Sequence, residues 1–297
     1  DSKTPLYALI ISSLTNIVLD LVFVLVFHMG VAGVALATAI AQALSAVFCY
    51  IRIYIHFREV LPKKNEWSPD RNIFKNVLRI GIPMSVQNIL VSFGMMSIQG
   101  IINGFGTNVV AGYTAANKVD QIALQFMMAI GTAMSTYAGQ NYGAKLSGRI
   151  FSGIRSALLM SAVSAAILTS IILFLGRFIV LLFMEAAETE VISIATGYLS
   201  TVSIFYLLCS VTYVYSNTLR GMGLVVIPTG SSFLELGAKI LGAGILSSIF
   251  GYRGIWFAWP ISWLFSSVLL IVYFHVFAAK KLKSLPAEGT SLPPDNL

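Results

Sequence analysis

The run ALLMSAVSAAILTSIILFL, residues 157–175, contains no charged side chain. The hydrocarbon core of a bilayer is about 30 Å thick, so a helix that crosses it needs roughly 20 apolar residues. Lipid offers the backbone no hydrogen bonds, and a segment in it must therefore bond to itself as a helix. A spanning strand would alternate apolar with polar residues, and this run does not. The run predicts one membrane-spanning helix.

Apolar runs of this kind recur along the whole chain. Of its 297 residues, 57% are hydrophobic and 10% are charged, whereas a soluble domain carries roughly 25% charged residues. We therefore expect an all-α, polytopic transmembrane helix bundle with about eight spans. The expected spans are Leu6–Phe27, Val31–Ile55, Ile82–Ile102, Val109–Gly139, Ile154–Leu175, Ile192–Ser216, Leu224–Phe250 and Ile255–Ala279.

The basic residues between these spans predict the orientation. An even number of spans puts both ends on one side, and loops rich in Lys and Arg stay in the cytoplasm. The loops on one side of the membrane hold only Arg177 and Arg253, and the loops on the other side hold the other basic residues assigned to loops. We expect a multi-pass protein of the cytoplasmic (inner) membrane with both ends of this chain in the cytoplasm. The loops on the expected cytoplasmic side contain Lys3, Arg52, Arg58, Lys63, Lys64, Arg71, Lys75, Arg79, Lys145, Arg149, Arg155, Arg220, Lys280, Lys281 and Lys283.

Two hairpins share a glycine pattern. Gly30, Gly33 and Ala37 at the start of the second span match Gly251, Gly254 and Ala258 before the eighth, all at an offset of 221 (251 − 30). Both copies run from the same side, as in transporters built from two parallel bundles. Chance remains the alternative, because Gly and Ala are common in membrane helices.

The repeat suggests a division into four segments. Residues 1–57 are expected to be the last two helices of an N-terminal lobe, which places about four helices upstream of this chain. Residues 58–80 form a cytoplasmic linker with a short interfacial helix, in which Ser68 is the expected N-cap and Pro69 the first helical residue. Residues 81–283 form a C-terminal six-helix lobe, and residues 284–297, rich in Pro, Gly and Ser, a disordered tail.

The fourth span carries polar side chains at membrane depth, namely Asn117, Lys118, Asp120 and Gln121. Ionisable residues inside a membrane helix are costly and mark functional candidates. Lys118 and Asp120 are two positions apart and do not face each other, so each needs a partner on another helix. The cluster is either the lining of a substrate cavity or proton relay, or a clamp that fixes helix packing.

Three other spans contribute candidates for the substrate or ion pathway. Glu235 and Lys239 are four apart in the favourable order for one helix, as a neutral structural pair or as a carboxylate that exchanges protons or sodium. Gln87 lies on the third span, where Gln99 and Asn103 share a face and either line a cleft or bond across helices. Asp20 lies in the outer part of the first span.

Several function classes find no support in the sequence. No catalytic triad, phosphate loop or metal motif is visible, so we expect no enzyme and no cofactor beyond a coupling ion. The formal charge of +7 is spread between apolar blocks and does not form the basic domain of a nucleic-acid-binding protein.

Six short runs of the chain resemble the MATE (multidrug and toxic compound extrusion) family, with its DinF-like bacterial branch most similar. The resemblance extends to about Lys283, and the order and spacing of the runs make it specific. The runs are Asp1–Pro5, Gly30–Thr38, Ala111–Gln121, Gly139–Ala144, Arg220–Gly223 with Pro228, and Gly251–Pro260.

The resemblance implies twelve helices in two six-helix lobes around a central cleft, with this chain beginning just before the fifth helix. It implies a monomeric antiporter that exports cationic, amphipathic drugs in exchange for H⁺ or Na⁺ as the lobes rock. In many members an acid on the first helix, which this chain lacks, carries the coupling ion. Some members also carry acids on helices that match the third and sixth spans. The absence of such acids here favours protons over sodium.

Three other functions stay open. A lipid-linked oligosaccharide flippase of the same fold would need a strongly cationic cavity, whereas Lys118 and Lys239 each have an acid nearby in the sequence. A membrane-embedded enzyme would need His, Asp or Cys groups converging at one depth. A passive channel or scaffold is less compatible with a two-bundle repeat.

Overall fold

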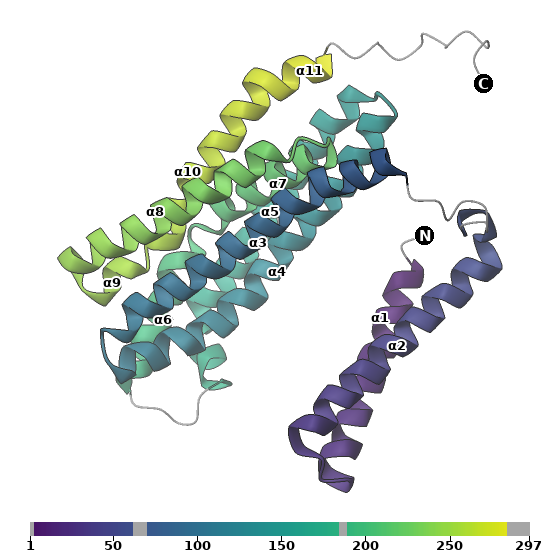
Figure 1. Cartoon of the computed structure of the whole chain (residues 1–297). Coiled ribbons are helices and arrows are strands. Elements are labelled where there is room, and N and C mark those ends of the chain that lie inside the picture. The colour runs from purple at the N-terminus through teal and green to yellow at the C-terminus, as the bar shows by residue number, and fades with distance from the viewer. Residues whose placement is uncertain (1–2, 62–69, 184–188, 284–297) are drawn as a thin grey trace. The chain divides into compact units, whose positions relative to one another are not determined.

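The computed structural model describes residues 3–61, 70–183 and 189–283. In these ranges every regular element is a helix (Figure 1), as predicted. The chain forms two compact units, residues 1–74 and 75–297. The predicted disordered tail at 284–297 and the predicted cap at Ser68 lie outside the described residues.

The first unit is a helical hairpin. Helices α1 (Lys3–Leu21) and α2 (Gly30–His56) are joined through the π-helical turn η1 (Val22–Val26), and the short 3₁₀ turn η2 (Arg58–Val60) follows α2. Small side chains let the two helices approach, with Ala8, Ala37 and Ala41 buried. The hydroxyl of Ser12 on α1 donates to the carbonyl of Ala41 at 2.9 Å. The amide of Asn16 donates to the Oγ1 of Thr38, and the Nε of Arg52 to the Oγ1 of Thr4, both at 3.3 Å. The pair is thus held by close packing and several interhelical hydrogen bonds.

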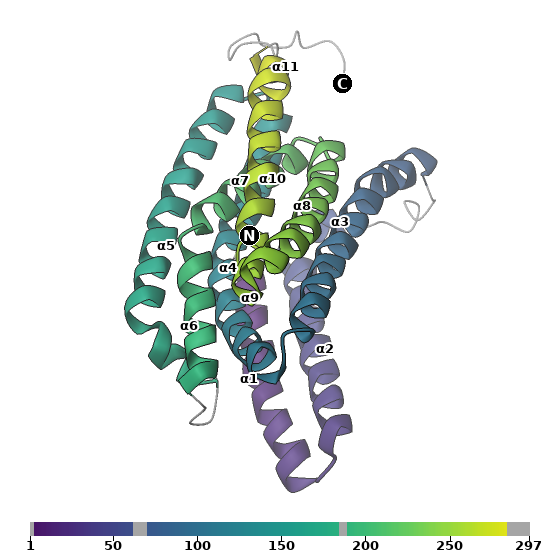
Figure 2. The ribbon, with the colours of Figure 1, turned by 90° about the vertical axis from the view of Figure 1, so that its left-hand side faces the viewer.

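The second unit contains the remaining helices, with α4 packed closely against α7 and α8 against α10. Figure 2 shows α5 and α6 on one side of this unit and α3 on the other. The helices are α3 (Arg71–Asn103), α4 (Thr107–Gly143), α5 (Ser147–Leu181), α6 (Thr189–Ser203), α7 (Tyr206–Gly221), α8 (Val226–Phe250), α9 (Tyr252–Ile255), α10 (Ala258–Tyr273), the π-helical turn η4 (Phe274–Ala278) and α11 (Ala279–Lys283).

All eight predicted spans are helical, and α4 differs from the others in composition. Within the described residues, six helical segments are long and apolar enough to cross a membrane, and the bent pair α6–α7 makes a seventh. With 37 residues, α4 is about 55 Å long at 1.5 Å per residue. It carries the polar Asn117–Gln121 cluster and is not among these segments. The helix with more candidate pathway residues than any other is therefore one of the less apolar helices.

The repeated glycines occupy equivalent places in the two hairpins. Gly30 and Gly251 have φ angles of +55° and +62°, in a region that residues other than glycine rarely adopt. A Cβ on Gly33 would lie 2.9 Å from the Cβ of Phe23, and one on Gly254 would lie 2.1 Å from the carbonyl oxygen of Leu246. In each copy, the first glycine adopts the φ angle that the turn requires, and the second lets the preceding helical segment pack closely against it. This shared geometry favours duplication over chance.

The predicted separate interfacial helix is wrong for its described part. Residues 71–78 are the first turns of α3, which continues past Pro83 to Asn103. Asp70 caps it, because its Oδ1 accepts from the backbone N–H of Asn72 at 2.7 Å and of Ile73 at 3.3 Å. Pro83 lacks the N–H that would bond to the carbonyl four residues earlier, and α3 continues past it. The hydroxyl of Thr229 on α8 bonds to the carbonyl of Val225 at 2.9 Å and to that of Pro83 at 3.3 Å.

The sixth predicted span is broken in the middle. Helices α6 and α7 meet at an angle of 51°, with Ile204 and Phe205 between them. A break of this kind leaves carbonyl groups without their helical partners. The hydroxyl of Thr169 on α5 donates to the Ser203 carbonyl at 2.7 Å. The bend is thus supported by a neighbouring helix, and Tyr206 begins the second half.

Candidate functional site

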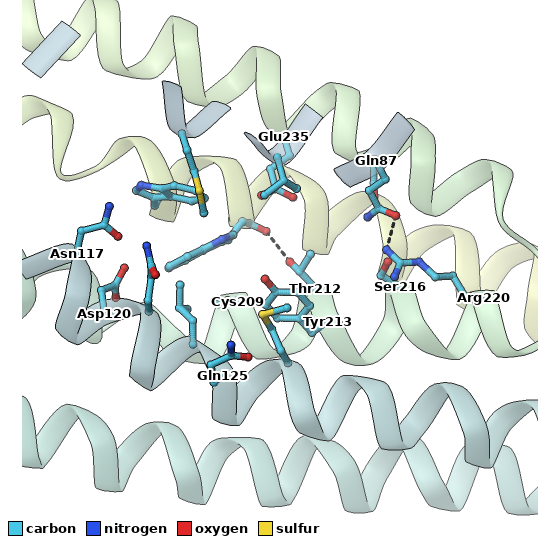
Figure 3. A pocket seen from close by; sticks show the side chains of 18 residues that line it. Gln87, Asn117, Asp120, Gln125, Cys209, Thr212, Tyr213, Ser216, Arg220 and Glu235 are labelled. Atoms are coloured by element: carbon cyan, nitrogen blue, oxygen red, sulfur yellow. Dashed lines mark hydrogen bonds between the residues drawn. The ribbon is translucent and has the colours of Figure 1, made fainter. Parts of the chain in front are cut away.

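A cavity of about 260 Å³ lies within the unit of residues 75–297. Five of its helices, α3, α4, α7, α8 and α10, contribute to the wall (Figure 3). Carboxylates, amides, hydroxyls, aromatic rings and one guanidinium group all reach it. The lining residues are Gln87, Val91, Met95, Asn117, Asp120, Gln121, Leu124, Gln125, Met128, Cys209, Thr212, Tyr213, Ser216, Arg220, Ser231, Glu235, Trp259 and Trp263.

Asp120 is the most enclosed carboxylate of the cavity, with only 3% of the residue exposed. The hydroxyl of Tyr206 donates to its Oδ1 at 2.7 Å, and the hydroxyl of Tyr198 donates to its Oδ2 at 3.3 Å. A buried carboxylate is costly unless it is hydrogen-bonded, and these two phenols supply the bonds. Because Tyr198 lies on α6 and Tyr206 on α7, the carboxylate joins the two halves of the bent span.

Glu235 lines the cavity from α8, and Lys239 stands one helical turn behind it. The Nζ of Lys239 lies 3.7 Å from the Oε1 of Glu235 and 3.4 Å from the ring centre of Trp259. Only 1% of Lys239 is exposed. On α3, a Cβ at Gly94 would lie 3.2 Å from this Nζ, so the glycine lets α3 cover the lysine. The ammonium group of Lys239 is therefore packed outside the cavity, and the carboxylate of Glu235 faces the cavity.

Arg220 forms part of the wall at another point. Its Nη2 donates to the side-chain oxygen of Gln87 on α3, and its Nη1 donates to the Oδ1 of Asn217 at 3.5 Å. The loop counting above assigned Arg220 to a cytoplasmic turn, whereas the structure includes it in the last turn of α7. The turn after the helix is made at Gly223, whose φ angle is +77°.

Five of the ten predicted pathway residues come together in this cavity. They are Gln87, Asn117, Asp120, Gln121 and Glu235. Sequence reasoning missed the groups that complete the site, because their partners are distant along the chain. The missed groups are Tyr198, Tyr206, Arg220, Trp259 and Trp263.

The other five predicted residues lie elsewhere. Lys118 is exposed on α4, and Lys239 is covered as described. Gln99 and Asn103 bond to each other, with the amide of Gln99 donating to the Oδ1 of Asn103 at 2.9 Å. Asp20 belongs to α1 in the other unit, where its Oδ1 is buried and finds no hydrogen-bond partner among the described residues. Their place in a pathway stays a prediction.

The cavity offers carboxylates to a cation but no ready-made metal centre. Within residues 3–61, 70–183 and 189–283, no three His, Cys, Asp or Glu side chains gather as metal ligands. Asp120 and Glu235 come from different helices, and each has its own protein partner. The arrangement suits an organic cation or an exchangeable ion.

Comparison with known proteins identifies the family of this chain. The MatE family model matches residues 83–245, which include most of the cavity wall. The chain belongs to the MATE family. Its relatives include the probable multidrug resistance protein YpnP of Bacillus subtilis, 29% identical over 95% of this chain and 63% of the relative. Another is the multidrug export protein MepA of Staphylococcus aureus, 23% identical over 81% of this chain and 52% of MepA.

Solved structures show the same fold. A MATE transporter crystallised in a bent conformation is 21% identical, with a TM-score of 0.84 over 95% of this chain and 63% of that one. An outward-facing multidrug resistance MATE transporter gives the same identity and TM-score over 93% of this chain. The chain spans about three fifths of the length of these relatives. The family's named members are multidrug transporters and not enzymes, and this chain is the multi-pass membrane protein that the apolar runs predicted.

Proposed function

We propose that the complete protein is a secondary active antiporter that exports cationic, amphipathic drugs in exchange for H⁺ or Na⁺. The cavity is the observation that supports this most. Asp120 and Glu235 supply negative charge, and Trp259, Trp263 and Met128 supply apolar and aromatic surface. Aromatic faces attract organic cations, and flexible methionine side chains suit varied ligands.

The proposed transport cycle is alternating access by two lobes in the cytoplasmic membrane. The repeated hairpins support two related bundles, which is the architecture in which one bundle rocks against the other. The loop charges support an orientation with both ends of this chain in the cytoplasm. We expect the complete protein to act as a monomer, because one chain of this family would carry both lobes.

Ion-driven drug efflux by the complete protein tests the proposal. Proteoliposomes are loaded with ethidium, and a pH gradient or a sodium gradient is imposed. Efflux that follows only the pH gradient identifies H⁺ as the coupling ion, and efflux that follows only the sodium gradient identifies Na⁺. If neither gradient drives ethidium out and a lipid-linked sugar is flipped instead, the protein is a flippase. The cavity disfavours that result, because two acids and one cation, Arg220, line it.

The substitution Glu235→Gln is expected to impair both efflux and folding. It leaves the ammonium of Lys239 buried without a counter-charge, and removing one partner of a buried pair costs about 3–5 kcal/mol. The double variant Glu235→Gln/Lys239→Met removes both charges, so stability in detergent should return toward that of the unsubstituted protein. Efflux should remain low if Glu235 binds substrate or ion. Recovery of efflux together with stability would make the pair purely structural.

A further inference from the structure

One end of the cavity is basic and the other is acidic. Figure 3 places Arg220, Gln87 and Ser216 together at one end, and Asn117 and Asp120 at the other. Tyr206, which bonds to Asp120, and Arg220 both belong to α7. Their separation along that helix is about 21 Å at 1.5 Å per residue. The two ends are therefore far enough apart to recognise different groups of one ligand.

No acidic side chain among the described residues pairs with Arg220. Its hydrogen-bond partners, Gln87 and Asn217, are neutral amides, and its Nε is buried with no acceptor in the part of the chain that the structure describes. Among the described residues the ion pair found is Lys239 with Glu235, and none includes Arg220. Arg220 is half-buried, and charges withdrawn from water in proteins are normally paired. An anion is the group that this end of the cavity lacks.

Ser216 provides a second, independent sign of a missing ligand. It precedes Arg220 by one helical turn on the same wall of the cavity and is 3% exposed. Its Oγ has no hydrogen-bond partner among the residues that the structure describes. The neighbouring hydroxyls of Thr212 and Thr218 donate to the carbonyls one turn earlier at 3.1 and 2.7 Å. The Ser216 hydroxyl therefore remains available as a donor.

The third polar group at this end is also a donor. Gln87 uses its side-chain oxygen to accept from Arg220, which leaves its NH₂ group to donate. Guanidinium groups bind carboxylates with paired, charge-assisted hydrogen bonds. A guanidinium, a hydroxyl and an amide N–H at one end of a cavity are the donor set for an oxyanion.

We propose that Arg220, Ser216 and Gln87 form an anion-binding subsite that takes the carboxylate of a substrate whose cationic part lies toward the carboxylates of Glu235 and Asp120. The inference rests on the proposed drug-export function and narrows it, because it makes zwitterionic amphiphiles better ligands than simple cations of the same shape. Apolar side chains of the cavity wall, such as Val91 and Trp263, offer surface for the body of the ligand.

Two dyes that differ in one group test the subsite. Rhodamine 110 carries a free carboxylate, and rhodamine 123 is its methyl ester. Fluorescence polarisation with the complete protein in detergent should show tighter binding of the acid by about tenfold or more, since a hydrogen bond to a charged group contributes about 1.5–3 kcal/mol. Arg220→Gln should remove this preference. Arg155→Gln, an exposed arginine of α5 outside the cavity, is the matched control and should keep it.

A second variant keeps the test decisive if Arg220→Gln does not fold. Ser216→Ala removes a hydroxyl that has no partner within the described residues, so stability should change little, while the preference for the acid should fall severalfold. Equal binding of acid and ester by the unsubstituted protein would overturn the subsite and leave the drug cavity standing. Binding of neither dye would overturn the proposed function as well.

Discussion

Asp120→Asn is expected to reduce ion-driven ethidium efflux by the complete protein to the leak of protein-free liposomes. Asparagine keeps the size of the side chain and one carbonyl acceptor, but it can bind neither a proton nor a cation as a carboxylate does. Asp120 is 3% exposed and accepts hydrogen bonds from Tyr206 and Tyr198. Since the helix and its packing remain, the loss should appear in transport and not in the amount of folded protein.

The two tyrosines should show a graded effect. Tyr206→Phe removes the 2.7 Å bond and Tyr198→Phe the 3.3 Å bond. A hydrogen bond to a charged group contributes about 1.5–3 kcal/mol, so Tyr206→Phe should lower driven efflux by about tenfold and Tyr198→Phe by less.

A carboxylate outside the cavity serves as the control for this series. Glu190, on α6, is exposed and bonds to the amide of Asn108 at 2.7 Å. Glu190→Gln should leave efflux unchanged. Normal efflux from Asp120→Asn would place the coupling group elsewhere in the protein and reduce Asp120 to a packing contact between α4 and the bent span.

The helices were predictable because the membrane imposes a strong local rule. A long uncharged run such as residues 157–175 has no other structure available in lipid, and α5 (Ser147–Leu181) contains it. The boundaries were less predictable. The segment at 71–78 was assigned to a separate helix because Ser68 and Pro69 form a start signal, whereas Asp70 caps a helix that runs on through Pro83.

The site was half predictable, for a reason that its residues make plain. Asp120 and Glu235 are conspicuous as charges inside apolar runs, so sequence reasoning found them. The tyrosines that hold Asp120 lie 78 and 86 positions further along the chain, and no local pattern reports such contacts. The bend that separates them contains Ile204 and Phe205, and neither is a helix breaker.

Counting charges between spans does not predict the position of Arg220. Counting Lys and Arg between spans predicts orientation, but it treats every cation near a span end as a loop residue. Arg220 occupies the last turn of α7 and reaches a cavity. Ser216, one turn earlier on the same face, was the sequence signal that could have suggested this, because together the two make a polar stripe that continues into the span.

Gly221→Ala is expected to destabilise the protein more than any other glycine substitution between α4 and α7. A Cβ on Gly221 would lie 2.2 Å from the carbonyl oxygen of Ser135 and 3.0 Å from the backbone N of Gly139, both on α4. Backbone atoms cannot turn aside as a flexible side chain can, so the helices must separate. Overpacking costs typically about 1–3 kcal/mol and occasionally more, and we expect the upper end.

The melting temperature in detergent should fall by about 6–12 °C, since each 1 kcal/mol lost corresponds to about 2–4 °C for a domain of this size. Gly244→Ala is the matched control, because nothing lies within 4 Å of a Cβ at this position of α8. Alanine there should be neutral or stabilise the helix by up to about 1 kcal/mol. Equal melting temperatures for the two variants would mean that α4 and α7 do not cross at Gly221. If the melting temperature falls only for Gly221→Ala, this variant should also bind rhodamine 110 more weakly. Arg220 is the immediate neighbour of Gly221 and moves with the end of α7.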